Sequence, residues 1–342
     1  YIQVTYRRQL IRCMIENEII YDRIKGCLTA VALSDALNNL KLTTGKSFKS
    51  AFKFNPDYRE KPVPEQYLQY YKGKNTTDKY LFLGFNGSPT MPPSNMMKAL
   101  IDSMHALMMW KEDTQKSGIY VDPTAYLNMA IDMSPWIKSY WEQFESRICW
   151  STAVAVGVLA TWLFDDSKDI NRDIKIVASS PLLALHLDDD EKDNARLIMK
   201  ERTICGILAA VIRNLIIYNR HVDTADYLQI VSECALRNLW GDELTCNVIG
   251  KEALCDASNL SVPMYDFLFH LLDWSRNSIE KGSTCHGRML YGGIRCSSIV
   301  GCVNGYESFP YKDMLKYVEV MPQIDELMTH VKTRFLNKTY FQ

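Results

Sequence analysis

The stretch "RIKGCLTAVALSDALNNL", residues 23–40, decides the fold class. Its apolar side chains recur at helical spacing and form one stripe, made up of Ile24, Cys27, Leu28, Val31 and Leu37. A stripe with this spacing is typical of a helix that packs one side against a protein core. The stretch therefore predicts a packed helix near the start of the chain.

Most of the remaining chain shows the same periodicity. Helices are expected within 92–110, 122–133, 134–164, 188–218, 224–237, 262–281, 298–308 and 311–335. Ser94 or Asn95 is placed to cap the first of these, and the apolar 134–164 segment predicts a central helix or two helices meeting at a bend. No stretch alternates with period two, and no internal repeat is visible. We therefore predict an all-α, compact single domain over residues 1–342.

Residues 43–92 are the exception to the helical pattern. Lys, Tyr, Pro and Gly dominate this segment, which ends in the turn-rich sequence "GFNGSPTMPPS". A segment of this length without periodicity is typical of an insertion over the surface or of a functional arm. Its aromatic side chains suit contact with another protein or packing against the same chain, and both interpretations stay open.

The charge balance bears on the partners. The 342-residue chain has 39 Lys and Arg against 40 Asp and Glu, which gives no electrostatic reason to expect nucleic acid or an anionic membrane as partner. A net charge of −1 also leaves little repulsion between copies, so self-association is permitted. Neither a signal-peptide pattern nor an apolar run long enough for a bilayer is seen, which favours an intracellular location.

The sequence contains ten cysteines, with no CxxC pair that would indicate a zinc ribbon. Four of them lie in helical apolar patterns and are predicted to be buried free thiols: Cys27, Cys149, Cys205 and Cys234. Three others are grouped near the end of the chain, where a disulfide or pairing between chains is the alternative: Cys285, Cys296 and Cys302.

Three motifs together resemble the ADP-ribosylglycohydrolase family, which includes the dinitrogenase reductase-activating glycohydrolases. "RIKGCLTAVALSDALNN" resembles the family's opening helix, R-x-x-G-x-x-x-G-x-A-x-G-D-A-L-G, and the matching residues are Arg23, Gly26, Ala32, Asp35, Ala36 and Leu37. "IVASSPLLAL" is similar to a central A-M-R-I-A-P-L segment. "GGIRCSSIVGCVNGYESFPYKDML" resembles the late G-G-D-T-D-T motif and the small-residue helix after it.

The resemblance implies an orthogonal helical bundle with two divalent metals, usually magnesium, in a central cleft. In the family, the metal ligands come from a D-D-T turn and from the aspartates of G-D-T-D-T. In this sequence, the D-D-T position reads Pro92, Pro93 and Ser94, and the late loop reads Ile294, Arg295, Cys296 and Ser297. Neither contains a carboxylate, which hard cations require, and Arg295 adds an opposing positive charge.

These positions therefore predict a relict cleft with no catalytic residue, no metal and no cofactor. Three of its residues could still contact a ligand: Asp35, Ser94 and Arg295. The preferred role for Asp35 is nevertheless a structural cap at a helix end.

The hypothesis that follows is a non-catalytic structural protein that assembles with itself, as a homo-oligomer or a larger matrix, crystal, occlusion or coat-like packing. Jellyfish lens crystallins of the same family show that the scaffold can serve for packing. Two alternatives remain. One is a pseudoenzyme that binds ADP-ribose or another nucleotide as a small-molecule ligand, and the other is a divergent ADP-ribosyl hydrolase with relocated metal ligands.

Overall fold

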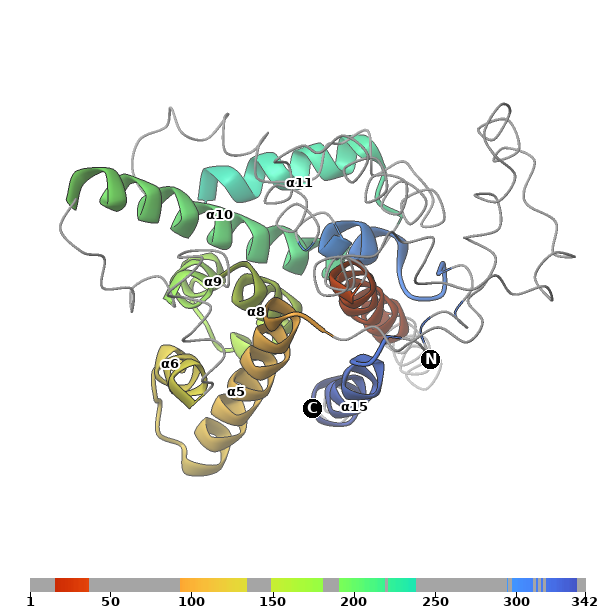
Figure 1. Ribbon diagram of the computed structural model, residues 1–342, viewed down its shortest axis with the longest axis horizontal. Coiled ribbons are helices and arrows are strands. Elements are labelled where there is room, and N and C mark those ends of the chain that lie inside the picture. The colour runs from red at the N-terminus through yellow and green to blue at the C-terminus, as the bar shows by residue number, and fades with distance from the viewer. Residues whose placement is uncertain are drawn as a thin grey trace, which may run out of the picture.

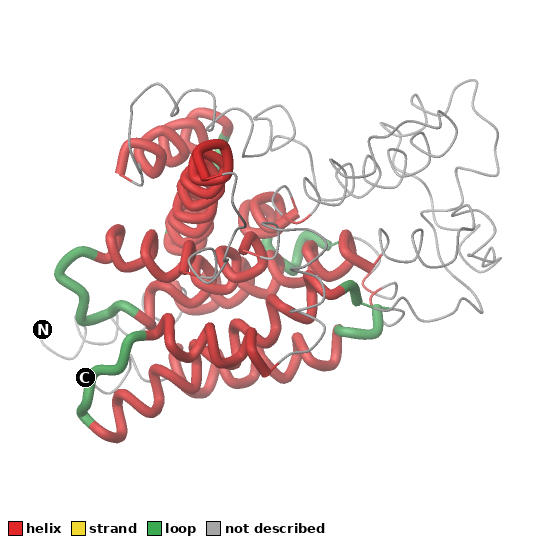
Figure 2. Tube along the Cα trace, turned by 60° about the vertical axis from the view of Figure 1, so that its left-hand side comes forward, coloured by secondary structure: helices red, strands yellow, loops and turns green. Residues whose placement is uncertain are grey.

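The computed structural model describes residues 16–36, 93–133, 149–180, 191–218, 221–237, 297–309 and 318–336, with the single residues 294, 312 and 315. Within this part of the chain 84% of the residues are helical and none forms a strand (Figure 2), which confirms the predicted all-α class. The insertion 43–92 and the expected helix 262–281 lie outside the described residues. No helix in the described ranges is long and apolar enough to span a membrane.

The described helices, labelled in Figure 1, follow one another along the chain as α5 (Asn95–Ser117), α6 (Pro123–Met133), α8 (Cys149–Leu163), α9 (Ile170–Ser179), α10 (Glu191–Ile217), α11 (Thr224–Arg237) and α15 (Met321–Val331). A π-helical turn, η5 (Lys332–Leu336), extends α15. Two further helical segments, 16–36 and 297–304, complete the described set.

Helix α8 is central and lies against α5, α9 and α10 (Figure 1). Its sequence, CWSTAVAVGVLATWL, is apolar on every side, and a helix with this composition is stable only when it is surrounded. A Cβ at Gly157 would lie 2.7 Å from the carbonyl oxygen of Ala209, so α8 and α10 approach at backbone distance. The second half of the predicted 134–164 segment is thus a central helix, while 134–148 lies outside the described residues and the choice between one helix and two stays open.

The segment 16–36 is buried more completely than its sequence pattern predicted. Every residue from 26 to 36 is buried, including Thr29 and Leu33 on the side opposite Ile24, Cys27, Leu28 and Val31. Small side chains between the large ones allow neighbouring helices to approach from all sides. The sequence pattern predicted burial of one side of this helix only, whereas all sides are buried. Leu37, the last member of the stripe, lies outside the described residues.

A very close helix contact joins Gly26 to Gly301 on the helix 297–304. A Cβ at Gly26 would lie 2.5 Å from the Gly301 carbonyl oxygen, and a Cβ at Gly301 would lie 2.4 Å from the Gly26 carbonyl oxygen. No real Cβ tolerates such distances, so only glycine permits this contact. In Figure 1 the helix 16–36 is the red ribbon, and the helix 297–304 is the unlabelled blue ribbon directly above it, not the darker α15.

The pair runs antiparallel, because Asp22, one turn before Gly26, meets the turn that follows 297–304. The Asp22 carbonyl accepts from Tyr306 N at 3.0 Å, and its Oδ1 accepts from Glu307 N at 2.8 Å. Gly305 ends the helix with φ 73°, and a Cβ there would lie 1.9 Å from Asp22 Oδ2. Glycine is therefore required at 305 by both conformation and space.

Arg23 connects the same segment to the end of α10. Its guanidinium is buried and donates to the carbonyl oxygens of Leu215 and Tyr218 at the end of α10, where a helix exposes its last carbonyl groups. The Tyr218 hydroxyl in turn donates to Asp226 on α11 at 2.6 Å. One buried cation thus stabilises a helix terminus and, through it, the position of the next helix.

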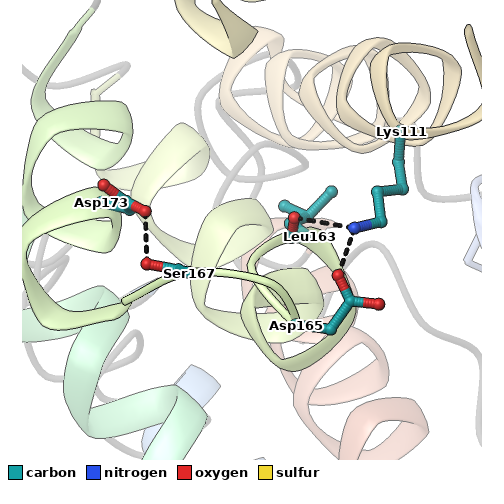
Figure 3. A network of polar contacts seen from close by, with 5 residues as sticks. All are labelled: Lys111, Leu163, Asp165, Ser167 and Asp173. Carbon is teal, nitrogen blue, oxygen red and sulfur yellow. Dashed lines mark hydrogen bonds and ion pairs between the residues drawn. The ribbon is translucent and has the colours of Figure 1, made fainter. Parts of the chain in front are cut away.

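A second buried cation joins α5 to α8 (Figure 3). Lys111 Nζ contacts Asp165 and donates to the Leu163 carbonyl at 3.2 Å, at the C-terminus of α8. In the same turn, Ser167 donates to Asp173 at 2.6 Å. The acidic run after α8 therefore takes part in the connection between helices.

The last helix departs from its predicted bounds. The pattern predicted one helix near 311–335, but α15 begins at Met321. Pro322 explains the difference, since proline fits the first turn of a helix while its ring clashes with the carbonyl four residues earlier in a helix interior. The late small-residue helix, expected over 298–308, ends at residue 304, before Gly305.

The glycine contact generates the first prediction. Gly301→Ala places a methyl group against the backbone of 16–36, where no side-chain rotation can relieve the overlap. We expect a loss of about 1–3 kcal/mol in the free energy of unfolding, even though alanine is the better helix former by about 1 kcal/mol. Urea denaturation of the variant and the wild type, followed by circular dichroism, measures this difference in the free energy of unfolding.

Gly118→Ala is the matched control, because a Cβ at Gly118 would meet no atom within 4 Å. Only the strain of the left-handed conformation, with φ 67°, applies there. Equal stability of Gly301→Ala and the wild type would contradict the backbone contact.

Candidate functional site

Two residues of the predicted relict cleft meet in the structure. The backbone N–H of Ser94 donates to Asp35 Oδ2 at 2.8 Å, and the Ser94 hydroxyl donates to Asp35 Oδ1. Ser94 is also the N-cap of α5, since its hydroxyl oxygen accepts from Met96 N at 3.1 Å. The Asp35 carboxylate therefore lies at the N-terminus of α5 and is engaged through both of its oxygens.

The position suits a carboxylate for a physical reason. The first turn of α5 has no acidic residue of its own, and a helix N-terminus has free N–H groups and partial positive charge. Asp35 supplies the missing negative charge from a different helix. It thus acts as a cap, but for α5 rather than for the helix that carries it.

Burial changes the acidity of Asp35. The side chain is only 4% exposed, and desolvation raises its pKa to about 6. The hydrogen bonds from Ser94 and the positive charge of Lys98 act in the opposite direction and limit the increase. At neutral pH the carboxylate is mostly ionised, within a low-polarity environment that would normally disfavour it.

A pocket of approximately 370 Å³ opens beside this cap, between the first turns of α5 and the approach to α15. The residues lining it are Pro93, Lys98, Ile101, Asp102, Glu319, Val320 and Gln323. Its charged groups are one ammonium and two carboxylates. This balance disfavours a ligand with two phosphates, because Asp102 and Glu319 would repel it.

The late loop of the relict cleft is described only in part. Ile294 is 2% exposed and Ser297 is fully buried. Since 297–304 runs antiparallel to 16–36, these residues lie toward the end of 16–36 that carries Asp35. At position 294, where the family resemblance places an aspartate, the structure has a buried hydrocarbon side chain.

The remaining sequence candidates for the cleft and its thiols lie outside the described residues. They are Pro92, Cys285, Arg295 and Cys296. Cys302 is described: it is buried and free, and its neighbour is Cys27. The predicted burial of Cys27, Cys205 and Cys234 as free thiols is confirmed.

No three His, Cys, Asp or Glu side chains in the described ranges are grouped so that they could hold a metal ion. Hard divalent cations take six or more oxygen ligands, whereas the described cleft offers one carboxylate whose oxygens already accept hydrogen bonds. The geometry described is therefore that of a structural polar contact between two helices.

The sequence patterns had not identified Lys98, Asp102 or Glu319 as candidate site residues. Lys98 and Asp102 lie four residues apart on α5, which puts them on one face of the helix and was a usable signal. Glu319 had no such signal, because it meets α5 only through the fold.

Compared with known proteins, the chain matches no family model, no curated protein and no solved structure.

The second prediction concerns Asp35→Asn. The folded-state pKa of about 6 lies above the ordinary aspartate pKa of about 3.9, so between these pH values the folded protein binds more protons than the unfolded chain. The contribution of Asp35 to wild-type stability should accordingly fall by about 2 kcal/mol as the pH rises from about 4 to about 7. The asparagine variant lacks this component, and its stability relative to wild type should improve with rising pH.

Urea midpoints of both proteins across this range measure the difference. Ser94→Ala is a useful companion, because loss of its hydroxyl removes a contact that lowers the pKa of Asp35 and should steepen the decline. Parallel pH profiles for wild type and Asp35→Asn would contradict the assignment.

Proposed function

We propose that this protein is a non-catalytic structural protein that associates with copies of itself, on a degenerate glycohydrolase-like helical scaffold. The observation that carries the proposal is an exposed apolar surface at the turn between α5 and α6. Three consecutive residues form it, Ile119, Tyr120 and Val121, with exposed fractions of 65%, 74% and 40%. We call these three residues the apolar tip.

The apolar tip belongs to a larger concentration of exposed hydrophobic side chains. Among the described residues, seven large hydrophobic side chains are exposed: Met109, Ile119, Tyr120, Val121, Met129, Ile217 and Leu228. The first five belong to α5, α6 or the turn that joins them. Single exposed apolar residues are ordinary, whereas a concentration on one hairpin is typical of a contact surface.

The apolar tip is also held in one conformation. Gly118 ends α5 with φ 67°, and its N–H donates to Thr114 O at 3.0 Å. Trp110 Nε1 donates to the Val121 carbonyl at 2.5 Å. The Trp110 ring meets Tyr120 edge to face at 6.3 Å. A preorganised surface loses little conformational entropy on binding, which favours association.

The charge of the chain favours another copy as the occupant of this surface. With a net charge of −1, two copies repel each other weakly, so burial of apolar area is not opposed over long distances. The non-catalytic part of the proposal is supported by the residues at two of the resembled ligand positions: Ser94 caps α5, and Ile294 is a buried hydrocarbon side chain. The resembled chemistry depends on two metals, which need oxygen ligands.

A small-molecule binder is the second candidate, favoured by the pocket beside Ser94. The pocket charges argue against ADP-ribose, whose two phosphates would face Asp102 and Glu319. We expect no heat of binding with millimolar ADP-ribose in titration calorimetry. Saturable binding that Ser94→Ala weakens would instead establish the nucleotide-binding alternative.

The third prediction tests self-association directly. Ile119→Asp places a charge in the apolar tip, and burying that charge between copies should weaken association about tenfold or more. Sedimentation velocity of the full chain over a wide concentration range measures this. Because Ile119 is 65% exposed, the variant should keep the thermal midpoint of the wild type.

Leu228→Asp is the matched control. Leu228 is 52% exposed on α11, away from the apolar tip, so its replacement should leave association unchanged. A wild-type chain that stays monomeric at every concentration, or equal weakening by both variants, would overturn the proposed function.

A further inference from the structure

Two buried thiols lie at the contact between the glycine-packed helices. Cys27 directly follows Gly26, and Cys302 directly follows Gly301, so the close approach of the glycines brings both cysteines to the same place. Both side chains have 0% exposed surface, and both thiols are free. The two thiols are within hydrogen-bonding range of each other.

The backbone spacing suits a disulfide. A Cβ at Gly301 would lie 2.8 Å from the Cα of Cys27. The Cα of Cys302 is one peptide step, about 3.8 Å, from that of Gly301. The Cα atoms of Cys27 and Cys302 are therefore at most about 8 Å apart, and disulfides join Cα atoms about 4.4–6.8 Å apart. Because the two thiols already contact each other, a bond between them needs only a small adjustment.

We propose that Cys27 and Cys302 are a redox-active pair, which a peroxide oxidises to an intrachain disulfide that fastens helix 16–36 to helix 297–304. The inference goes beyond the proposed function and does not depend on it. Hydrogen peroxide suits a buried pair because it is small and uncharged. It reaches the sulfurs during transient opening of the helix contact.

The environment assigns different roles to the two thiols. Cys302 interacts electrostatically with the buried Arg23 guanidinium, and it is the sulfur that attacks the peroxide first. Burial, followed by the contact with Cys302, raises the pKa of Cys27 well above its usual value. Cys27 therefore stays protonated and acts second.

The chemistry balances in two steps. The Cys302 sulfur attacks one peroxide oxygen and the O–O bond breaks, which gives a sulfenic acid, while the Cys302 thiol proton joins the departing hydroxide to form water. The Cys27 sulfur then attacks the Cys302 sulfur, its proton leaves with the hydroxyl group as a second water, and the S–S bond forms. Two thiols are oxidised and one peroxide is reduced to two waters.

The test uses the full chain under native conditions. Protein is exposed to excess hydrogen peroxide, remaining thiols are alkylated, and the digest is analysed by mass spectrometry without reduction. We expect a peptide pair joined through Cys27 and Cys302 that a thiol reductant separates. The oxidised protein should also unfold at a midpoint several degrees above the reduced one, because the crosslink closes a very long loop.

Cys27→Ser and Cys302→Ser should each lose the joined peptides and the increase in midpoint. Cys205→Ser is the matched control, since Cys205 is also buried and free but lies on α10, and it should behave as the wild type. Free, alkylatable Cys27 and Cys302 after prolonged oxidation, or their pairing with other cysteines instead, would overturn the proposal. If a serine variant fails to fold, the wild-type peptide map decides by itself.

Discussion

The backbone contact between Gly26 and Gly301 is the constraint on which the rest of the described structure depends. At these two positions the two helices meet backbone to backbone, in an antiparallel register that only glycine at both positions permits. That register puts Asp22 against the turn after Gly305, and it sets Cys27 beside Cys302. A methyl group at either glycine would separate the helices and disturb all of these contacts.

Around this pair, buried charges serve as connectors. Arg23 donates to a carbonyl oxygen at the end of α10, and Lys111 donates to a carbonyl oxygen at the end of α8. Asp35 accepts a hydrogen bond from a backbone N–H at the start of α5. Each contributes a charge that the helix terminus itself lacks, and each is removed from water to do so. The raised pKa of Asp35 shows that removing a charged side chain from water costs free energy, which the hydrogen bonds from Ser94 only partly offset.

The interior and the exterior of the described protein thus suggest different roles. Where the family resemblance places metal ligands, the described cleft has a capped helix and the buried hydrocarbon of Ile294, so its residues mainly contribute stability. The exposed hydrophobic side chains concentrate instead on the α5–α6 hairpin, held by Trp110 and Gly118. The exposed apolar tip, rather than the cleft, is the part of the described structure on which the proposed self-association rests.

The sequence alone determined the helical class, the central position of α8 and the burial of most described cysteines, because periodicity and composition report directly on local conformation and burial. It also indicated the loss of carboxylates at the resembled motif positions, since that is a matter of residue identity. Only the tertiary structure decided that Asp35 caps α5 across 59 residues and that 16–36 is buried on every side. The physical reason is that a pattern along one helix shows which face is apolar, whereas the partner that meets each face, and how closely, is set by segments distant in the chain.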